Sequence, residues 1–170
     1  KSSLPHELRQ MNPSRRPLYQ FEDNTAHSCS EHGVKTYPGS GLEPDDTPAI
    51  FRNTKSYRNA GNGVFIHNSR NIVIDGGVFA DNRVAIDIDR SPTCVVQDAK
   101  IIGYSPEYKA IAGPASFRKH CPSGWPLRGV ELHTYWQGGD KNTGTEVADT
   151  FFDHFGDSEC KLKYYVFGPL

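Results

Sequence analysis

One segment of the chain, FADNRVAIDIDR, alternates apolar and charged residues in a way that could place acid–base groups side by side. In a β-strand, successive side chains point to opposite faces. If the two isoleucines face a core, Asp87 and Asp89 lie together on the opposite, exposed face beside Arg90. Such a face allows three interpretations: a solvated surface with ion pairs, a surface for a charged polymer, or a metal or acid–base site.

The chain repeats itself at a spacing that suits stacked coils of short strands. Residues 63–79, GVFIHNSRNIVIDGGVF, align without gaps with residues 85–101, AIDIDRSPTCVVQDAKI, at an offset of 22. The apolar positions of the two segments coincide: Val64 with Ile86, Ile66 with Ile88, Ile72 with Cys94, Ile74 with Val96, and Phe79 with Ile101. Short β-branched runs at this period predict an all-β chain folded as a parallel β-helix, with rungs of about 22 residues that bury a shared core. An ordinary β-sandwich is the alternative.

Weaker echoes extend this pattern along the chain. They are FEDN (21–24) with FADN (79–82), and the series GVKTY (33–37), GVFIH (63–67) and GVELH (129–133). Asparagines recur at the expected corners, at positions Asn24, Asn59 and Asn82. Asparagine tolerates the left-handed backbone conformation and can form side-chain ladders, so we expect both at these corners.

The repeats predict the organisation of the chain. We expect an N-terminal arm or cap over 1–20, a β-helix over 21–157 with insertions at about 38–48 and 105–126, and a C-terminal strand or tail over 158–170. A β-helix has open ends whose exposed strand edges invite pairing. We therefore expect caps, a segment of a larger precursor, or self-association through the rung ends.

Stacking the rungs produces two outward columns of side chains. The first column is Lys35, Phe65, Asp87 and Glu131, and the second is Tyr37, His67, Asp89 and His133. This arrangement requires Val64, Ile66, Ile86, Ile88, Val130 and Leu132 to face the core. Neighbouring rungs lie about 4.8 Å apart, so stacked carboxylates should perturb one another or recruit a cation.

The same face supports a catalytic and a binding hypothesis. A hydrolytic site would use Asp87, Asp89 and Glu131 as acid–base groups, with His67 or His133 as proton carrier. A glycan-binding face would use aromatic rings that stack on sugars and cations that meet uronate carboxylates. Those residues are Tyr37, Phe65, Tyr135 and Trp136, and Lys35, Arg90 and Arg128. A negative face would repel a polyanion, which counts against catalysis on an acidic polymer.

Composition limits the class of protein. A chain of 170 residues is long enough for one domain with a core, and its net charge of −1 gives no broad basic surface for nucleic acid. No apolar run approaches the roughly 20 residues of a membrane span, so we expect no direct membrane insertion. The chain opens at Lys1 without a methionine, which suggests a processed piece of a longer protein.

The four cysteines are widely spaced and form no CxxC pair, which argues against a zinc or redox motif. An even number permits two disulfides, while buried free thiols are a common alternative. We expect at least one disulfide, and we choose Cys121–Cys160 as the bridge.

Several segments resemble one family of extracellular proteins. RPLYQFEDNTAHSCSEHGV, AIFRNTKSYRNAGNGVFI, GGVFADNRVAIDI and WPLRGVELH are similar, in this order, to segments of the cell-migration-inducing and transmembrane hyaluronidase family, with which fibrocystin-like proteins share a β-helix. The resemblance covers about 17–157. It implies a right-handed parallel β-helix, an extracellular setting or an ectodomain, and contact with a long acidic polysaccharide. Because the residues linked to catalysis in that family lie mainly upstream, it assigns no catalytic residue here.

No metal site is predicted. HSCSEH (27–32) groups potential ligands of a transition metal, but the resemblance places His27 at a rung corner. PDDTP (44–48) could hold Ca²⁺ weakly through Asp45 and Asp46, although a simple turn fits it better. No other cofactor is expected.

The sequence thus predicts an extracellular β-helix that interacts with an acidic polysaccharide such as hyaluronan. A hyaluronidase-like glycoside hydrolase and a structural module of a secreted coat are the two alternatives.

Overall fold

The chain folds as a parallel β-helix, which confirms the predicted fold class. The computed structural model describes residues 18, 20–36, 48–105, 127–133, 144–155 and 165–167. Every regular element in these ranges is a strand, and all strand pairs are parallel. None of the described segments forms a helix that is long and apolar enough to cross a membrane.

The strands form three sheets, and each pass of the chain adds one strand to each sheet. Sheet A contains β1 (Phe21–Glu22), β4 (Ala49–Arg52), β7 (Ile72–Asp75), β10 (Val95–Gln97) and β13 (Glu146–Ala148). Sheet B contains β2 (Thr25–His27), β5 (Lys55–Tyr57), β8 (Val78–Ala80), β11 (Lys100–Ile102) and β14 (Phe151–Asp153). Sheet C contains β3 (Val34–Thr36), β6 (Asn62–His67), β9 (Val84–Asp89), β12 (Arg128–His133) and β15 (Tyr165–Phe167).

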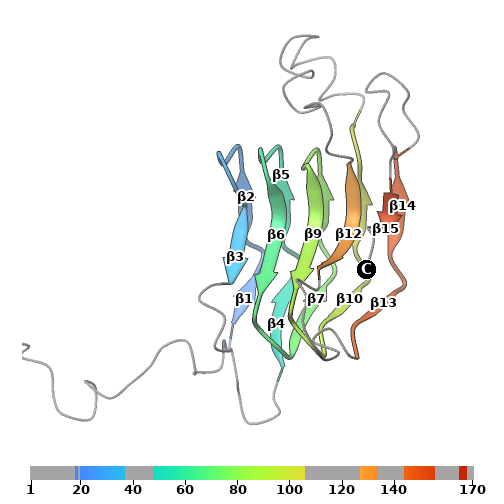
Figure 1. Ribbon diagram of the computed structural model, residues 1–170. Helices are drawn as coiled ribbons and strands as arrows, with labels where there is room; N and C mark the ends of the chain where they lie inside the picture. Colours follow the sequence, from blue (N-terminus) through green and yellow to red (C-terminus); the bar gives the residue numbers. More distant parts are fainter. Residues whose placement is uncertain are drawn as a thin grey trace, which may run out of the picture.

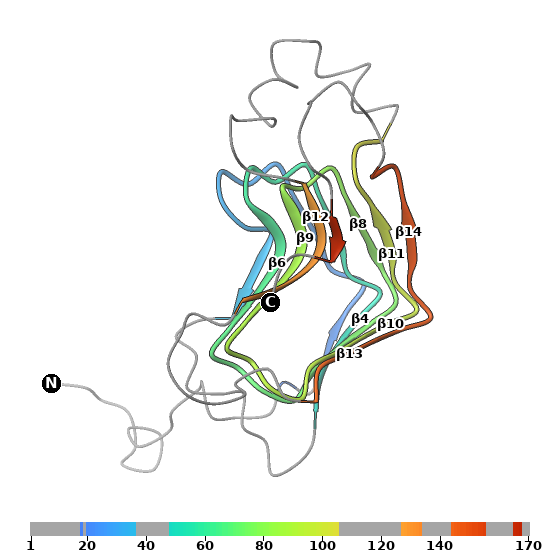
Figure 2. The same cartoon turned by 45° about the vertical axis from the view of Figure 1, so that its right-hand side comes forward.

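The rungs stack in chain order along one axis. Figure 1 shows them from the blue strands β1, β2 and β3 at one end to the red strands β13, β14 and β15 at the other. Figure 2 shows how the three sheets enclose a common interior. Side chains on one face of each sheet therefore point into a shared core, and those on the other face point outward.

The observed register confirms the alignment of the two repeated segments. Four predicted pairs are Cα partners in neighbouring strands: Val64 with Ile86, Ile66 with Ile88, Ile74 with Val96, and Phe79 with Ile101. The spacing of 22 residues is not uniform, however. Val34 and Val64 are partners 30 residues apart, and Ile86 and Val130 are partners 44 residues apart, because longer connections separate these rungs.

The inward residues of sheet C form the centre of the core, as predicted. Val64, Ile66, Ile86, Ile88 and Val130 are completely buried, and Leu132 packs against them. Burial of one such side chain contributes about 1.5–3 kcal/mol, so this column is a main source of stability.

The corners differ from the prediction in one respect. The left-handed conformation belongs to the residue before each predicted asparagine, with φ of 55° at Asp23, 57° at Arg58 and 57° at Asp81. The three asparagines themselves, Asn24, Asn59 and Asn82, do not have positive φ angles. The bend at each corner therefore lies one residue earlier than we expected.

Two of these asparagines nevertheless form the expected ladder. Asn82 Oδ1 accepts hydrogen bonds from the backbone N–H and the Nδ2 of Asn59, both at 3.0 Å, and Asn82 Nδ2 donates to the Ser56 carbonyl at 2.8 Å. Asn59 Oδ1 accepts in turn from the backbone N–H of Cys29 at 3.0 Å. The Asn24 side chain is exposed and its Nδ2 donates locally, to the Glu22 carbonyl at 3.1 Å.

This ladder explains the glycines of two Gly-Val dipeptides, Gly33 and Gly63. A Cβ at Gly63 would lie 2.6 Å from the Ala85 carbonyl oxygen and 2.7 Å from Asn82 Nδ2, closer than real Cβ atoms approach such groups. Glycine is therefore required where the chain passes over a ladder asparagine. The segments starting at Gly33, Gly63 and Gly129 occupy equivalent positions in sheet C, so this echo is confirmed.

The other weak echo is wrong. Phe21 of FEDN lies in β1 of sheet A and pairs with Phe51, whereas Phe79 of FADN lies in β8 of sheet B and pairs with Ser56. The two tetrapeptides resemble each other because different corners use the same residue types.

Replacing a ladder asparagine should destabilise the fold. In Asn82→Ala, the two Asn59 donors lose their acceptor inside the protein, so we expect the free energy of unfolding to fall by about 3 kcal/mol. Urea denaturation measures the loss, with Asn24→Ala as the control at an exposed corner, where we expect a change within about 0.5 kcal/mol. Equal losses in the two variants would show that the ladder has no special role.

Two of the cysteines are free thiols with different environments. Cys94 is completely buried, which raises the pKa of its thiol to about 11, while Cys29 is partly exposed. The expected Cys121–Cys160 disulfide lies outside the described residues.

Alkylation should separate these two thiols. Because the thiolate is the reacting species, we expect iodoacetamide at pH 8 to modify Cys29 and to leave Cys94 unmodified until the protein is unfolded. Peptide mass spectrometry identifies the modified residue. Rapid modification of Cys94 in the folded protein would contradict its burial.

Candidate functional site

The first predicted outward column exists on sheet C. Lys35 on β3 is the Cα partner of Phe65 on β6, Phe65 is the partner of Asp87 on β9, and Asp87 is the partner of Glu131 on β12. The sequence therefore predicted the register of four strands, including β3, which precedes a long connection, and β12, which follows one.

The second column is also present over the described strands. His67 on β6, Asp89 on β9 and His133 on β12 are successive Cα partners. The other predicted aromatic residues, Tyr37, Tyr135 and Trp136, lie outside the described residues.

The expected exposure of the carboxylates is wrong. Asp87 retains 5%, Asp89 3% and Glu131 1% of the exposure of a free residue. A buried carboxylate is costly unless hydrogen bonds or ion pairs compensate its charge. The partners of each carboxylate therefore determine what this face can do.

Asp89 is held by two residues. His67 Nδ1 lies 2.6 Å from Asp89 Oδ2, and the Arg90 guanidinium donates through Nε to Oδ1 at 3.1 Å and through Nη2 to Oδ2 at 3.2 Å. Paired donors from one arginine make a strong, oriented contact with a carboxylate. The ion pair that the solvated-surface interpretation expected is therefore present, but it is mostly shielded from solvent.

His67 is surrounded by three polar side chains, those of Asp89, Asn68 and Arg90. Asn68 Nδ2 lies 3.0 Å from His67 Nε2, and Arg90 Nη2 lies 3.1 Å from Nε2 and 3.4 Å from Nδ1. Because Arg90 Nη2 is close to both ring nitrogens, it lies against the ring and is not in line with one lone pair. The ring is therefore held between Arg90 and Asp89.

The other two carboxylates have different partners. Asn62 Nδ2 donates a hydrogen bond from a neutral amide to Asp87 Oδ2 at 2.7 Å, and the Arg128 guanidinium forms an ion pair with Glu131. Arg90 and Arg128 thus offset the charges of Asp89 and Glu131. Lys35, Arg90 and Arg128 match the three carboxylates in number, so the face is not the negative surface that the sequence suggested.

Sequence reasoning missed the role of Asn62. Asn62 has the same parity along its strand as Val64 and Ile66, so the period-2 pattern predicted that it faces inward. Its amide instead contacts the outward Asp87, because the first residue of this long strand departs from simple alternation. Arg128 does the same on β12, where it reaches Glu131.

An aromatic and cationic patch lies at the N-terminal part of this face. The Lys35 Nζ lies 5.5 Å from the centroid of the Phe65 ring, and the rings of His32 and His67 lie 4.9 Å and 5.3 Å from that centroid. Lys35 is exposed, while Phe65 and His32 are half-buried. We call these four residues the Phe65 patch.

His32 was assigned by sequence to a possible metal cluster, but it belongs to the Phe65 patch. His27 stacks on Tyr57 at 5.0 Å on sheet B, so the two histidines of HSCSEH contact different sheets. Across the described ranges, no group of three or more His, Cys, Asp or Glu residues could hold a metal ion. The possible Ca²⁺ ligands Asp45 and Asp46 lie outside those ranges.

Comparison with known proteins defines the class of this chain. Residues 10–106 match the family described as "Right handed beta helix region", so the chain belongs to that family. The predicted right-handed β-helix is thereby confirmed, whereas no comparison identifies the hyaluronidase family. No curated protein matches the chain.

Two solved structures have a similar arrangement. The A-module of mannuronan C-5 epimerase AlgE6 from Azotobacter vinelandii is 13% identical, with a TM-score of 0.38, over 88% of this chain and 49% of that chain. The corresponding AlgE4 module is 13% identical, with a TM-score of 0.24, over 78% of this chain and 53% of that chain. This chain spans about half the length of these structures.

His32 should make stability depend on pH. Burial, and then the charge of Lys35, lower the pKa of His32 below 6.5, and its Nδ1 accepts a hydrogen bond from the Asn62 backbone at 3.3 Å. The folded state binds this proton less readily than the unfolded state. The contribution of His32 to the free energy of unfolding is therefore complete above pH 6.5 and is lost as the pH falls below that value.

We therefore expect the His32→Asn variant, which keeps an acceptor near the position of Nδ1, to lose part of the slope of unfolding free energy against pH just below 6.5. Urea unfolding at several pH values measures the slope. NMR titration of His32 provides a second readout, and a pKa at or above the ordinary value would contradict the expectation.

Proposed function

We propose that the outward face of sheet C binds an extended acidic polysaccharide such as hyaluronan, in an extracellular protein. One observation carries this proposal: the carboxylates of the face are buried in ion pairs and hydrogen bonds, while two of its cations, Lys35 and Arg90, reach the solvent. The Asp89 side chain is 4% exposed, whereas Arg90 retains 29% exposure beside it and Lys35 is exposed. The surface offered to a ligand is therefore cationic and aromatic.

The chemistry of this surface fits uronate sugars. Arginine and lysine bind carboxylates through charge-assisted hydrogen bonds, and Phe65 offers the partly exposed ring face on which a sugar could stack. Successive rungs, spaced about 4.8 Å apart, repeat such groups along a long, shallow face. The resemblance to hyaluronan-depolymerising proteins supports the same class of ligand.

The geometry favours binding over hydrolysis. Both oxygens of Asp89 accept hydrogen bonds from Arg90, and Oδ2 also lies 2.6 Å from His67 Nδ1, so a proton transfer by Asp89 would have to break this ion pair. Asp87 and Glu131 are the remaining carboxylates on neighbouring strands, and they are the acid–base pair that a hydrolytic site would have to use. Loss of polymer length in the presence of the protein, abolished by Asp87→Asn, would establish that alternative.

A pair of charge reversals tests the binding face. Lys35→Glu places a negative charge on the Phe65 patch, whereas Lys55→Glu makes the same change on the outward face of sheet B. We expect Lys35→Glu to weaken binding of fluorescent hyaluronan oligosaccharides about tenfold, which corresponds to about 1.4 kcal/mol, and Lys55→Glu to have a much smaller effect.

The measurement is fluorescence anisotropy at low and high salt, because a contact between charged groups weakens as salt screens it. Polymannuronate and polygalacturonate test the choice of uronate, and neutral dextran is the negative control. Equal losses in both variants would indicate non-specific charge attraction. Absence of binding to every uronate polymer would favour the structural-module alternative.

A further inference from the structure

Both ends of the described rung stack present strand edges. Among the described residues, β1, β2 and β3 pair with strands on one side only, and so do β13, β14 and β15 at the other end. In the described part of the chain, each end therefore presents one strand edge from each of the three sheets that has no strand paired with it. Such edges are templates for further strand pairing.

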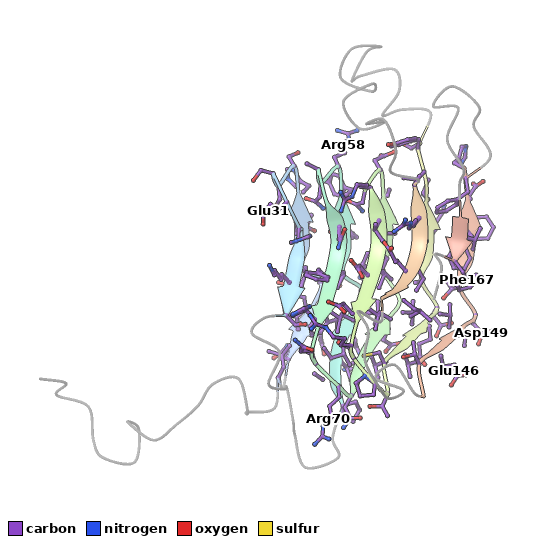
Figure 3. All side chains as sticks on the ribbon, viewed as in Figure 1. Glu31, Arg58, Arg70, Glu146, Asp149 and Phe167 are labelled. Carbon is purple, nitrogen blue, oxygen red and sulfur yellow. The ribbon has the colours of Figure 1, made fainter. Side chains whose placement is uncertain are left out.

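The C-terminal end also exposes apolar core residues. Phe167 on β15 continues the inward column of Val130, yet it is 52% exposed. Its ring lies 5.5 Å from that of Phe152, which continues the inward column of sheet B. Figure 3 shows Phe167 at this end of the stack, together with Glu146 and Asp149. The last described rung thus exposes an aromatic surface that includes Phe167.

The inward residues of the first rung complement this surface in size. They are Phe21 on β1, Ala26 on β2 and Val34 on β3, and the equivalent residues of the last rung are Val147, Phe152 and Phe167. If a second copy continued the register, Phe21 would meet Val147, Ala26 would meet Phe152, and Val34 would meet Phe167. A large residue would meet a smaller one in all three sheets, as close packing requires.

The outward residues add one favourable and one unfavourable contact. In the continued register, His27 of the second copy would lie beside Asp153, and Asp23 would lie beside Asp149. A like-charge pair at an exposed corner costs less than about 1 kcal/mol. The corner aspartates therefore make the contact weak at low salt but do not prevent it.

We propose that the N-terminal end of one copy docks on the C-terminal end of another, so that β1, β2 and β3 extend the three sheets beyond β13, β14 and β15. Because this contact joins different surfaces, it does not close on itself and can add further copies in a row. The proposal is independent of polysaccharide binding and is tested without any polymer.

Two variants, each altered at one end, test the direction of docking. Phe167→Lys places a charge on the C-terminal end, and Val34→Lys places one on the N-terminal end. We expect the wild-type chain to show an average mass that rises with concentration in sedimentation equilibrium. Each variant alone should remain at the monomer mass of 18.9 kDa. An equimolar mixture should form dimers and nothing larger, because the intact end of each variant is used in the dimer and only the two altered ends remain.

Comparison of the single variants with their mixture distinguishes the proposed end-to-end contact from other modes of association. A symmetric dimer through the C-terminal ends would persist in Val34→Lys alone and disappear in Phe167→Lys, which would overturn the proposal. A monomeric wild-type chain at millimolar concentration and high salt would also overturn it. Circular dichroism verifies that each variant is folded, and Ala26→Lys replaces Val34→Lys if the latter is unfolded.

Discussion

The structure depends on the spacing between rungs. Neighbouring strands in a parallel sheet lie about 4.8 Å apart, so each side chain lies directly above its equivalent in the next turn. Apolar residues satisfy this constraint by packing, which produces the buried column from Val64 to Val130. Polar residues must form hydrogen bonds along the stack, as Asn59 and Asn82 do. Glycine is required where a stacked amide leaves no room for a Cβ, as at Gly63.

The same spacing shapes the candidate binding face. Phe65, Asp87 and Glu131 are stacked by register, so the two carboxylates cannot avoid each other by moving apart. Asn62 donates a hydrogen bond to Asp87, Arg128 pairs with Glu131, and Asp89 is held by Arg90 and His67. These contacts leave the three carboxylates buried, whereas Lys35 and Arg90 reach the solvent. Our proposal that the face binds an acidic ligand rests on this difference in exposure.

Much of the fold could be predicted from the sequence, because the strand alternation and the rung repeat are properties of single residues and their spacing. Val64 and Ile86 match by type, and so do Ile66 and Ile88, which was sufficient to obtain the register of β6 and β9. The burial of Asp87 and Asp89 could not be predicted in this way. It depends on which side chains reach across from neighbouring rungs, and Asn62 and Arg128 do so against the expected alternation.

The residue types at the corners were a second source of error in the prediction from sequence. Aspartate and asparagine recur at several corners for the same conformational reason, so FEDN and FADN looked equivalent although they belong to different sheets. By contrast, the longer segments GVKTY, GVFIH and GVELH were matched correctly, because their valines continue one inward column of sheet C. The glycine alone is not diagnostic, since a Cβ at Gly77, which precedes Val78 on sheet B, would also lie too close to its neighbours.

The central claim is that sheet C, and not sheet A or sheet B, presents the ligand-binding face. The most direct measurement is the change in backbone amide chemical shifts when a hyaluronan octasaccharide is added to the isotopically labelled protein. Our account predicts that the largest changes occur at Lys35, Phe65, His67 and Arg90, on neighbouring strands of one face. Changes concentrated around Lys55 and Lys100 on sheet B, or no change at saturating oligosaccharide, would contradict it.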